Sequence, residues 1–94
     1  MALRLSHRIN EGARIVSDVT IDVIVRKINF VTHDVEVEVR TDGESKWMRL
    51  YPSLDFQEIH PRVKIKGAAR KERYASIDYQ ADRSIPINKE KYTN

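Results

Sequence analysis

The side chains best suited to chemistry in this sequence are cations concentrated in one short stretch. Residues 61–73 carry a single acid, Glu72, and six basic residues: Arg62, Lys64, Lys66, Arg70, Lys71 and Arg73. The first three alternate with Val63 and Ile65, a pattern typical of a β-strand with one basic face. Alternate side chains of a strand lie about 7 Å apart, close to the phosphate repeat of an extended nucleic-acid chain. The stretch therefore predicts contact with a polyanion.

A row of acidic residues offers these cations a different partner. Asp34, Glu36 and Glu38 alternate with valines and are predicted to line one face of another strand. Because the acidic and basic rows match in length, they could pair with each other across neighbouring strands or subunits. The sequence supports polyanion binding and this pairing about equally.

Residue types that catalyse reactions or bind metals are present but dispersed. The three histidines, His7, His33 and His60, lack the short spacing of metal ligands. The three glycines are isolated from one another, so the sequence has no glycine-rich loop to hold a phosphate. No serine stands in a G-x-S-x-G motif. We therefore expect a binding protein, not an enzyme, that needs no metal or cofactor.

Length and composition predict one small domain over residues 1–94. The chain is 40% hydrophobic and 33% charged, which allows one modest core with a well-solvated surface. A core of this size favours assembly into a homodimer or a higher oligomer. Cysteine is absent, and no long apolar segment indicates a signal peptide or a membrane span. We expect a cytoplasmic protein without membrane contact.

Alternation of apolar and polar residues predicts a mainly β fold, either a small antiparallel sheet or a barrel-like domain. The clearest element is a hairpin over residues 34–51, with Asp42 and Gly43 in its turn. Pro86 should place the last strand at a sheet edge or a bulge. Further strands are expected at residues 19–25, 62–66, 74–81 and 84–88.

Two segments are predicted to interrupt the strands. In residues 52–61 the apolar residues fit the period of neither a strand nor a helix, and the sequence allows a short helical turn capped by Ser53. Gly67 is predicted to end the basic strand, with residues 68–73 forming a charged turn.

Both ends of the chain contain motifs of a known kind. Residues 5–15 read LSHRINEGARI and residues 18–23 read DVTIDV, while residues 77–90 read IDYQADRSIPINKE. In order, these stretches resemble the patterns LTRRxGExxxI, with its alternating V/I strand, and IGVxAPxxVxVxRE of the carbon storage regulator family of RNA-binding translational regulators. Asn10 stands where that family has glycine, and asparagine is the next-best residue for a turn with positive φ.

The resemblance implies an intertwined homodimer, in which the first strand of one subunit lies beside the last strand of the other. It also implies two equivalent sites along these edges, each binding a GGA-containing RNA hairpin. Carried onto this sequence, the site comprises Arg4, Leu5, Arg8, Ile87 and Lys89. Leu5 would pack on a base, and the cations would meet phosphates. These five residues and four basic residues of the central stretch together form the predicted RNA-binding set. The four are Arg62, Lys64, Lys66 and Arg70.

The sequence departs from the family pattern in places. Residues 29–62 have no counterpart in the family and are expected to be an insertion containing the acidic hairpin. Asp82 replaces a proline. Lys89 replaces an arginine, which keeps the charge but loses the planar fork of donors.

Two other functions remain open. One is an oligomeric β protein that binds or sequesters a small anionic nucleotide between subunits, with Trp47 and Tyr51 as a stacking wall and the basic strand at the phosphates. The other is a structural or protein-interaction module, in which the acidic and basic rows pair between subunits.

Overall fold

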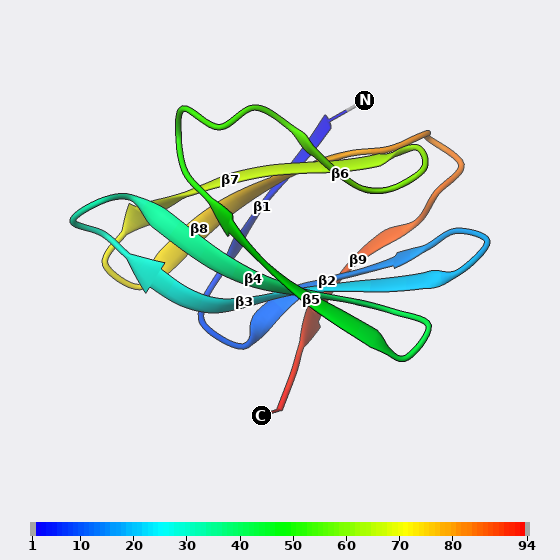
Figure 1. The fold of residues 1–94 in the computed structure, drawn as a ribbon, viewed down its shortest axis with the longest axis horizontal. Helices are drawn as coiled ribbons and strands as arrows, with labels where there is room; N and C mark the ends of the chain where they lie inside the picture. The colour runs from blue at the N-terminus through cyan, green and yellow to red at the C-terminus, as the bar shows by residue number, and fades with distance from the viewer. Residues whose placement is uncertain (1, 94) are drawn as a thin grey trace.

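Nine β-strands, arranged in two antiparallel sheets, make up the fold of residues 2–93, which are the residues that this computed structural model describes (Figure 1). The prediction of a mainly β fold is therefore confirmed. The four-stranded sheet has the order β1-β8-β7-β6, and the five-stranded sheet has the order β5-β4-β3-β2-β9. The strands are β1 (Ala2–His7), β2 (Glu11–Val16), β3 (Thr20–Asn29), β4 (Asp34–Thr41), β5 (Glu44–Leu50), β6 (Gln57–His60), β7 (Val63–Lys71), β8 (Tyr74–Gln80) and β9 (Ile87–Lys91).

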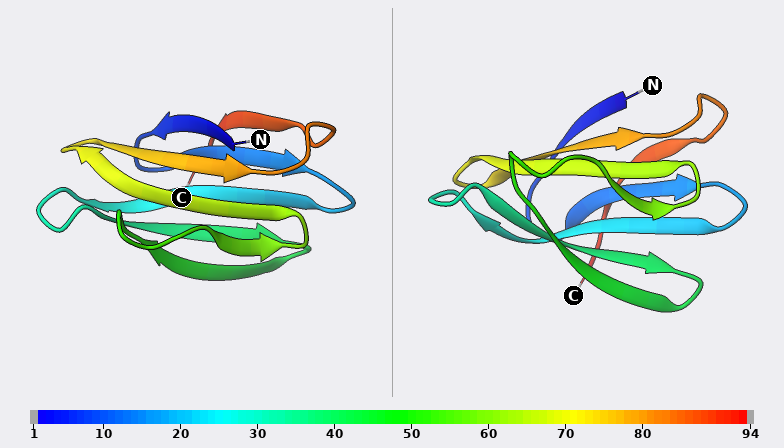
Figure 2. Two further views of the ribbon diagram at one scale, coloured as in Figure 1. Left: turned by 90° about the horizontal axis from the view of Figure 1, so that it is seen from above. Right: turned by 45° about the horizontal axis from the view of Figure 1, so that its top comes forward.

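The two sheets lie face to face as layers, and their inner faces form the core (Figure 2). Alternation in the sequence produces this arrangement, because every second residue of a strand points to the same side. Val23 of β3, Val37 of β4 and Ile65 of β7 are fully buried between the layers. Burying one such side chain stabilises the folded state by about 1.5–3 kcal/mol. The hydrogen-bonded sheets are separate, so the fold is an open sandwich rather than a closed barrel.

The predicted hairpin over residues 34–51 is confirmed as β4 and β5. Asp42 and Gly43 have φ values of 50° and 78°, as a type I′ turn between two antiparallel strands requires. The valines of β4 are almost fully buried in the shared core. Residues 29–62, predicted from the family resemblance to be an insertion, supply β4, β5 and β6 and are an integral part of this sandwich.

The short helical turn that the sequence allows within residues 52–61 does not form. A tight turn, closed by the hydrogen bond from Leu54 N to Tyr51 O (3.0 Å), leads instead into β6. β6 pairs with β7, which gives the backbone groups of this segment partners that an isolated helical turn would lack.

The prediction that Gly67 ends the basic strand is wrong. β7 continues through Gly67 to Lys71, and Ala68 and Ala69 are buried. A Cβ atom at position 67 would lie 2.6 Å from Ile77 Cδ1, so this glycine permits close packing within the strand rather than a turn. The turn comes later, at Glu72 and Arg73.

The last strand begins later than predicted, at Ile87 instead of residue 84. β9 is an edge strand of the five-stranded sheet, as the position of Pro86 predicts. The Pro86 carbonyl accepts a hydrogen bond from Val16 N at 3.1 Å. Proline therefore stands just before the paired strand, where its missing N–H leaves no gap in the ladder.

Asn10 adopts the positive φ that the sequence predicts, at 67°. The turn at residues 8–10 carries the chain from β1 in one sheet to β2 in the other, so these consecutive strands do not pair with each other. Asn10 N donates to Val25 O and Asn10 O accepts from Tyr92 N, both at 2.7 Å. The result is that β1 and β9, near the two ends of the chain, are edge strands on the same flank of the sandwich (Figure 2).

Candidate nucleic-acid interface

Five of the nine predicted RNA-binding residues share the solvent side of the four-stranded sheet. We call this surface the basic face; its cations are Arg4, Arg8, Lys64, Lys66 and Arg70. On β7, Lys64 and Lys66 alternate with the buried residues Val63 and Ile65, which places the two lysines on the outside. Figure 2 (left) looks onto this side of the sheet, and no other ribbon lies over β7 or β8.

A cross-strand row of charges occupies the middle of the basic face. Arg4 of β1, Asp78 of β8 and Lys66 of β7 lie opposite one another in register. Arg4 donates two hydrogen bonds to the carboxylate, from Nε to Oδ1 at 2.7 Å and from Nη2 to Oδ2 at 3.1 Å. The Arg4 guanidinium holds the pKa of Asp78 below its usual range, and Arg70 and Lys66 act in the same direction. Three cations thus surround one carboxylate.

Arg8 belongs to the same face through its contact with Tyr74. Its guanidinium carbon lies 4.9 Å from the centre of the Tyr74 ring, and Nη2 donates a hydrogen bond to the Tyr74 hydroxyl. This is a cation–π geometry. The contact between Arg8 and Glu11 uses the Arg8 backbone N–H, which donates to Oε1 at 2.8 Å, so the guanidinium is not held by that carboxylate.

The carboxylates of the acidic row pair with basic residues of their own, five-stranded sheet. Glu38 accepts hydrogen bonds from Arg26 at 2.9 Å and from Arg40 at 2.7 Å. Glu36 lies 3.8 Å from Lys27 Nζ, and Asp34 lies 4.0 Å from Arg49 Nε. Pairing between the acidic and basic rows on neighbouring strands is therefore contradicted. The physical reason is that the two rows lie on the outward faces of opposite sheets.

Arg62 does not extend the basic row of β7, contrary to the sequence prediction. It lies in the turn between β6 and β7 with a φ of 73°. Its Nη1 atom is 3.9 Å from an oxygen of Asp82. The prediction assumed that side chains alternate between the two faces of a strand. This alternation holds only for extended backbone, and Arg62 has a left-handed conformation.

The remaining predicted residues lie on the flank formed by β1 and β9, which we call the open side. Leu5 points inward from the edge strand β1 and is partly buried against the core. Ile87 of β9 also packs against the core and is half-buried. Lys89 is exposed, in register with Ala13 of β2. The structure thus divides the predicted set between the basic face, the open side and one turn.

A buried histidine lies behind the open side. His7 is fully buried, and its Nε2 atom is 2.8 Å from the Tyr79 hydroxyl. Burial, followed by the nearby charge of Lys89, lowers the pKa of His7 to about 4. Its Nδ1 atom has no hydrogen-bond partner among the described residues. The alternation of Leu3, Leu5 and His7 along β1 is a sequence signal for this inward position.

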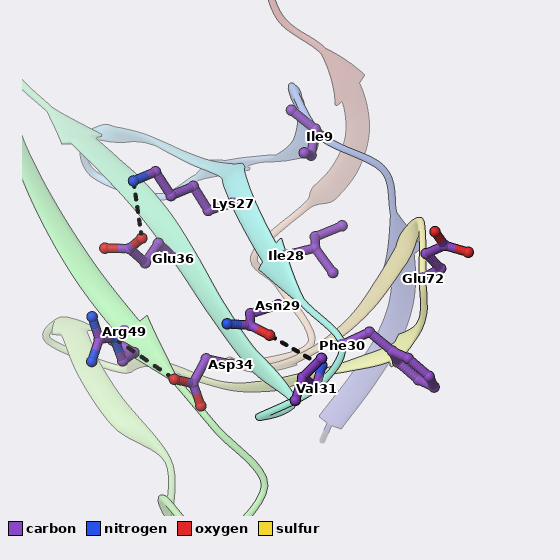
Figure 3. Close-up of a pocket in the computed structure, with 10 residues that line it drawn as sticks. All are labelled: Ile9, Lys27, Ile28, Asn29, Phe30, Val31, Asp34, Glu36, Arg49 and Glu72. Atoms are coloured by element: carbon purple, nitrogen blue, oxygen red, sulfur yellow. Dashed lines mark hydrogen bonds and ion pairs between the residues drawn. The ribbon is translucent and has the colours of Figure 1, made fainter.

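A groove of about 700 Å³ lies next to the turn between β3 and β4 (Figure 3). The sequence analysis did not predict it. Its apolar lining comprises Ile9, Ile28, Phe30 and Val31. Ion pairs between Lys27 and Glu36 and between Arg49 and Asp34 form its polar side. The lining of the groove does not include Lys64 or Lys66 of β7, and its own cations, Lys27 and Arg49, lie beside carboxylates.

Trp47, which the sequence suggests as a stacking residue, is 54% exposed. It stands opposite Glu38, on the outer face of the five-stranded sheet. Within one protomer it therefore faces away from the lysines of β7. Nucleotide binding between Trp47 and the basic strand would require a second protomer to bring them together.

Comparison of the chain with protein-family models, curated proteins and solved structures finds no match. Within residues 2–93 no group of three or more His, Asp or Glu residues is arranged to hold a metal ion, and no helix is long and apolar enough to cross a membrane. The clues to function are therefore the geometry of the basic face and the motifs at the chain ends.

Proposed function

We propose that this chain binds RNA through its basic face and acts as a post-transcriptional regulator of translation. The observation that supports the proposal is the gathering of five cations on one uncovered sheet face. On the solvent side of the described strands of that sheet the acids are Asp78 and Glu58. The cations therefore exceed the acids, and phosphates are the ligands that such a surface attracts most strongly.

The internal pairing of the acidic row also favours a ligand for the basic face. Arg26, Arg40, Lys27 and Arg49 lie at the carboxylates of β4. A module held together by acidic and basic rows of two subunits would have to break these ion pairs. Binding of a separate polyanion to the basic face would leave the ion pairs of the acidic row intact.

The resemblance to the carbon storage regulator family refines the proposal. It suggests a homodimer built on the open side, a GGA-type hairpin as the RNA, and residues 29–62 as an addition to the family fold. β1 would serve both surfaces, because Arg4 points to the basic face while Leu5 points inward at the open side. Lys89 of β9 would supply the cation that meets a phosphate at the open side.

Replacing both Lys64 and Lys66 with alanine is expected to weaken binding of a labelled GGA hairpin about tenfold and to lower the salt slope by about 2, one unit for each phosphate that no longer meets a lysine. Fluorescence anisotropy at salt concentrations between about 50 and about 300 mM measures both quantities. The matched control replaces Lys27 and Lys46, two exposed lysines of the five-stranded sheet, and should leave both unchanged.

The same assay distinguishes the two surfaces and the competing functions. If Lys89→Ala lowers the affinity for RNA and the Lys64/Lys66 double substitution does not, the RNA site lies on the open side and not on the basic face. Failure of the wild-type protein to bind any GGA hairpin at low salt would refute the proposal. Native mass spectrometry then reports whether the purified protein retains a small nucleotide and how many subunits it contains.

A further inference from the structure

Three exposed apolar side chains share the groove next to the β3–β4 turn (Figure 3). Val31 is 89% exposed, Ile9 is 51% exposed and Phe30 is 45% exposed. They come from two separate turns, because Ile9 follows β1 while Phe30 and Val31 follow β3. Exposed apolar side chains that share a concave surface are typical of a ligand-binding groove.

The turn that follows β3 is held in place by hydrogen bonds. Asn29 Oδ1 accepts from Val31 N at 3.0 Å. The carbonyl of His33 accepts from Ala69 N at 3.0 Å, and His33 Nδ1 lies 3.2 Å from Ala69 O. A turn of the five-stranded sheet is thus tied to β7 of the four-stranded sheet. Because the turn is already ordered, a ligand would bind it without the entropic cost of ordering it.

Phe30 offers an aromatic ring whose orientation is fixed. The centre of its ring lies 5.3 Å from that of His33, with the two ring planes at 76°. An edge-to-face neighbour covers at most one face of a ring. A ring that is fixed and nearly half exposed is a suitable platform on which a flat group such as a nucleobase stacks.

Cations adjoin the groove where it meets the four-stranded sheet. Glu72 lines the groove at the β7–β8 turn, and its neighbours in the chain, Lys71 and Arg73, are exposed. Arg8, next to the groove residue Ile9, is held at the start of β8 by its cation–π contact. An apolar groove beside three cations suits a ligand with a flat ring next to an anionic group. A nucleotide has this chemistry.

The polar side of the groove offers groups that fit the edge of a base. The amide oxygen of Asn29 accepts from Val31 N, which leaves the Nδ2 group on the other side of the amide (Figure 3). Glu36 and Asp34 lie 3.8 and 4.0 Å from their cations, farther than a hydrogen bond. Their oxygen atoms can therefore accept from the N–H groups of a base.

We propose that this groove binds one unpaired base of an RNA loop, which stacks on Phe30 while Arg8 and the cations of the β7–β8 turn meet the adjoining phosphates. The inference rests on the proposed RNA-binding function and adds to it a site for a base at one end of the basic face. Single-stranded loops are the parts of an RNA that proteins recognise in this way, because their unstacked bases expose both faces and edges.

The test places 2-aminopurine, a fluorescent base whose emission falls when it stacks, at each loop position of a GGA hairpin in turn. The full chain should quench one position. Phe30→Ala should abolish this quenching and weaken binding about tenfold, the loss of one stacked base, while Phe30→Tyr should retain both. The salt slope should not change, because no phosphate contact is lost. Trp47→Ala, at an exposed aromatic residue of the opposite sheet, is the matched control and should change neither quenching nor affinity.

Val31→Glu is a second variant, at a side chain so exposed that its replacement should leave the fold intact. The added negative charge in the groove should weaken RNA binding about fivefold. Circular dichroism reports whether each variant folds. Unchanged affinity in folded Phe30→Ala, with no loop position quenched by the wild-type protein, would overturn the base site. If the Lys64/Lys66 double substitution still weakened binding, the proposed function would stand without it.

A second probe separates the two ideas if no hairpin binds. Adenosine and guanosine 5′-monophosphate are titrated into the ¹⁵N-labelled full chain. Saturable shifts of the Ile9, Phe30 and Val31 amide signals would uphold the base site and refute the proposed function, whereas unmoved signals would refute both. Shifts caused by an acidic peptide that contains phenylalanine, but by neither nucleotide, would make the groove a peptide site and overturn the inference.

Discussion

Substituting Gly12 with alanine is expected to lower the free energy of unfolding by about 3 kcal/mol or more. Gly12 lies on β2 in register with Ile24 of β3. A Cβ atom at this position would lie 1.7 Å from the backbone oxygen of Val23 and 2.7 Å from its carbonyl carbon. β3 is hydrogen-bonded on both sides, to β2 and β4, so its backbone cannot move away without loss of ladder hydrogen bonds.

Urea denaturation followed by far-ultraviolet circular dichroism measures this loss. Gly43→Ala is the matched control, because Gly43 has a positive φ of 78° but nothing within 4 Å of its Cβ position. Only backbone strain of about 1–2 kcal/mol is then expected. If Gly12→Ala destabilised the protein less than Gly43→Ala, β2 and β3 could not approach each other as closely as the structure indicates.

Lowering the pH from 6.5 towards 4 is expected to destabilise the protein through His7 by up to about 3 kcal/mol. The pKa of buried His7 is about 4 in the folded protein, against 6.5 for an unperturbed histidine. In this window the unfolded chain binds a proton that the folded chain does not, so unfolding becomes more favourable as the pH falls. Tyr79 cannot offset this, since burial raises the pKa of its hydroxyl and keeps it neutral.

The free energy of unfolding, measured in urea at several pH values between 7 and 5, tests this expectation. At these pH values the carboxylates whose pKa is lowered, such as Glu38 and Asp78, stay ionised and add little slope. His7→Phe should remove most of the pH dependence, while His33→Asn, at an exposed position, should retain it. Equal slopes in wild type and His7→Phe would show that another group is responsible.

The elements that the sequence predicts correctly are those decided by neighbouring residues. The β4–β5 hairpin follows from alternating valines and the Asp42–Gly43 turn. The edge position of β9 follows from Pro86, and the positive φ of Asn10 follows from its residue type. In each case the backbone preference of one or two residues is sufficient.

The predictions that fail concern segments whose structure depends on contacts with residues distant in the sequence. Gly67 has the appearance of a strand terminator, but packing against Ile77 makes it an interior strand residue. Residues 57–60 have no strand pattern, and their pairing with β7 makes them β6. Neither partner is adjacent in the chain, so local preference could not predict either outcome.

The candidate site shows the same division. Alternation alone places Lys64 and Lys66 on one side of a strand. It does not reveal that Arg4 and Arg8, some sixty residues earlier in the sequence, join them across β8, or that the acids of β4 are held within the opposite sheet.

By itself the sequence determined the strand class, the main hairpin and the basic character of β7, because side-chain alternation and turn geometry are properties of short backbone segments. The tertiary structure alone decided which strands are neighbours, and with them which cations gather on the basic face. Strand pairing depends on long-range hydrogen bonds and on the packing of two layers, and neither is encoded in a local pattern.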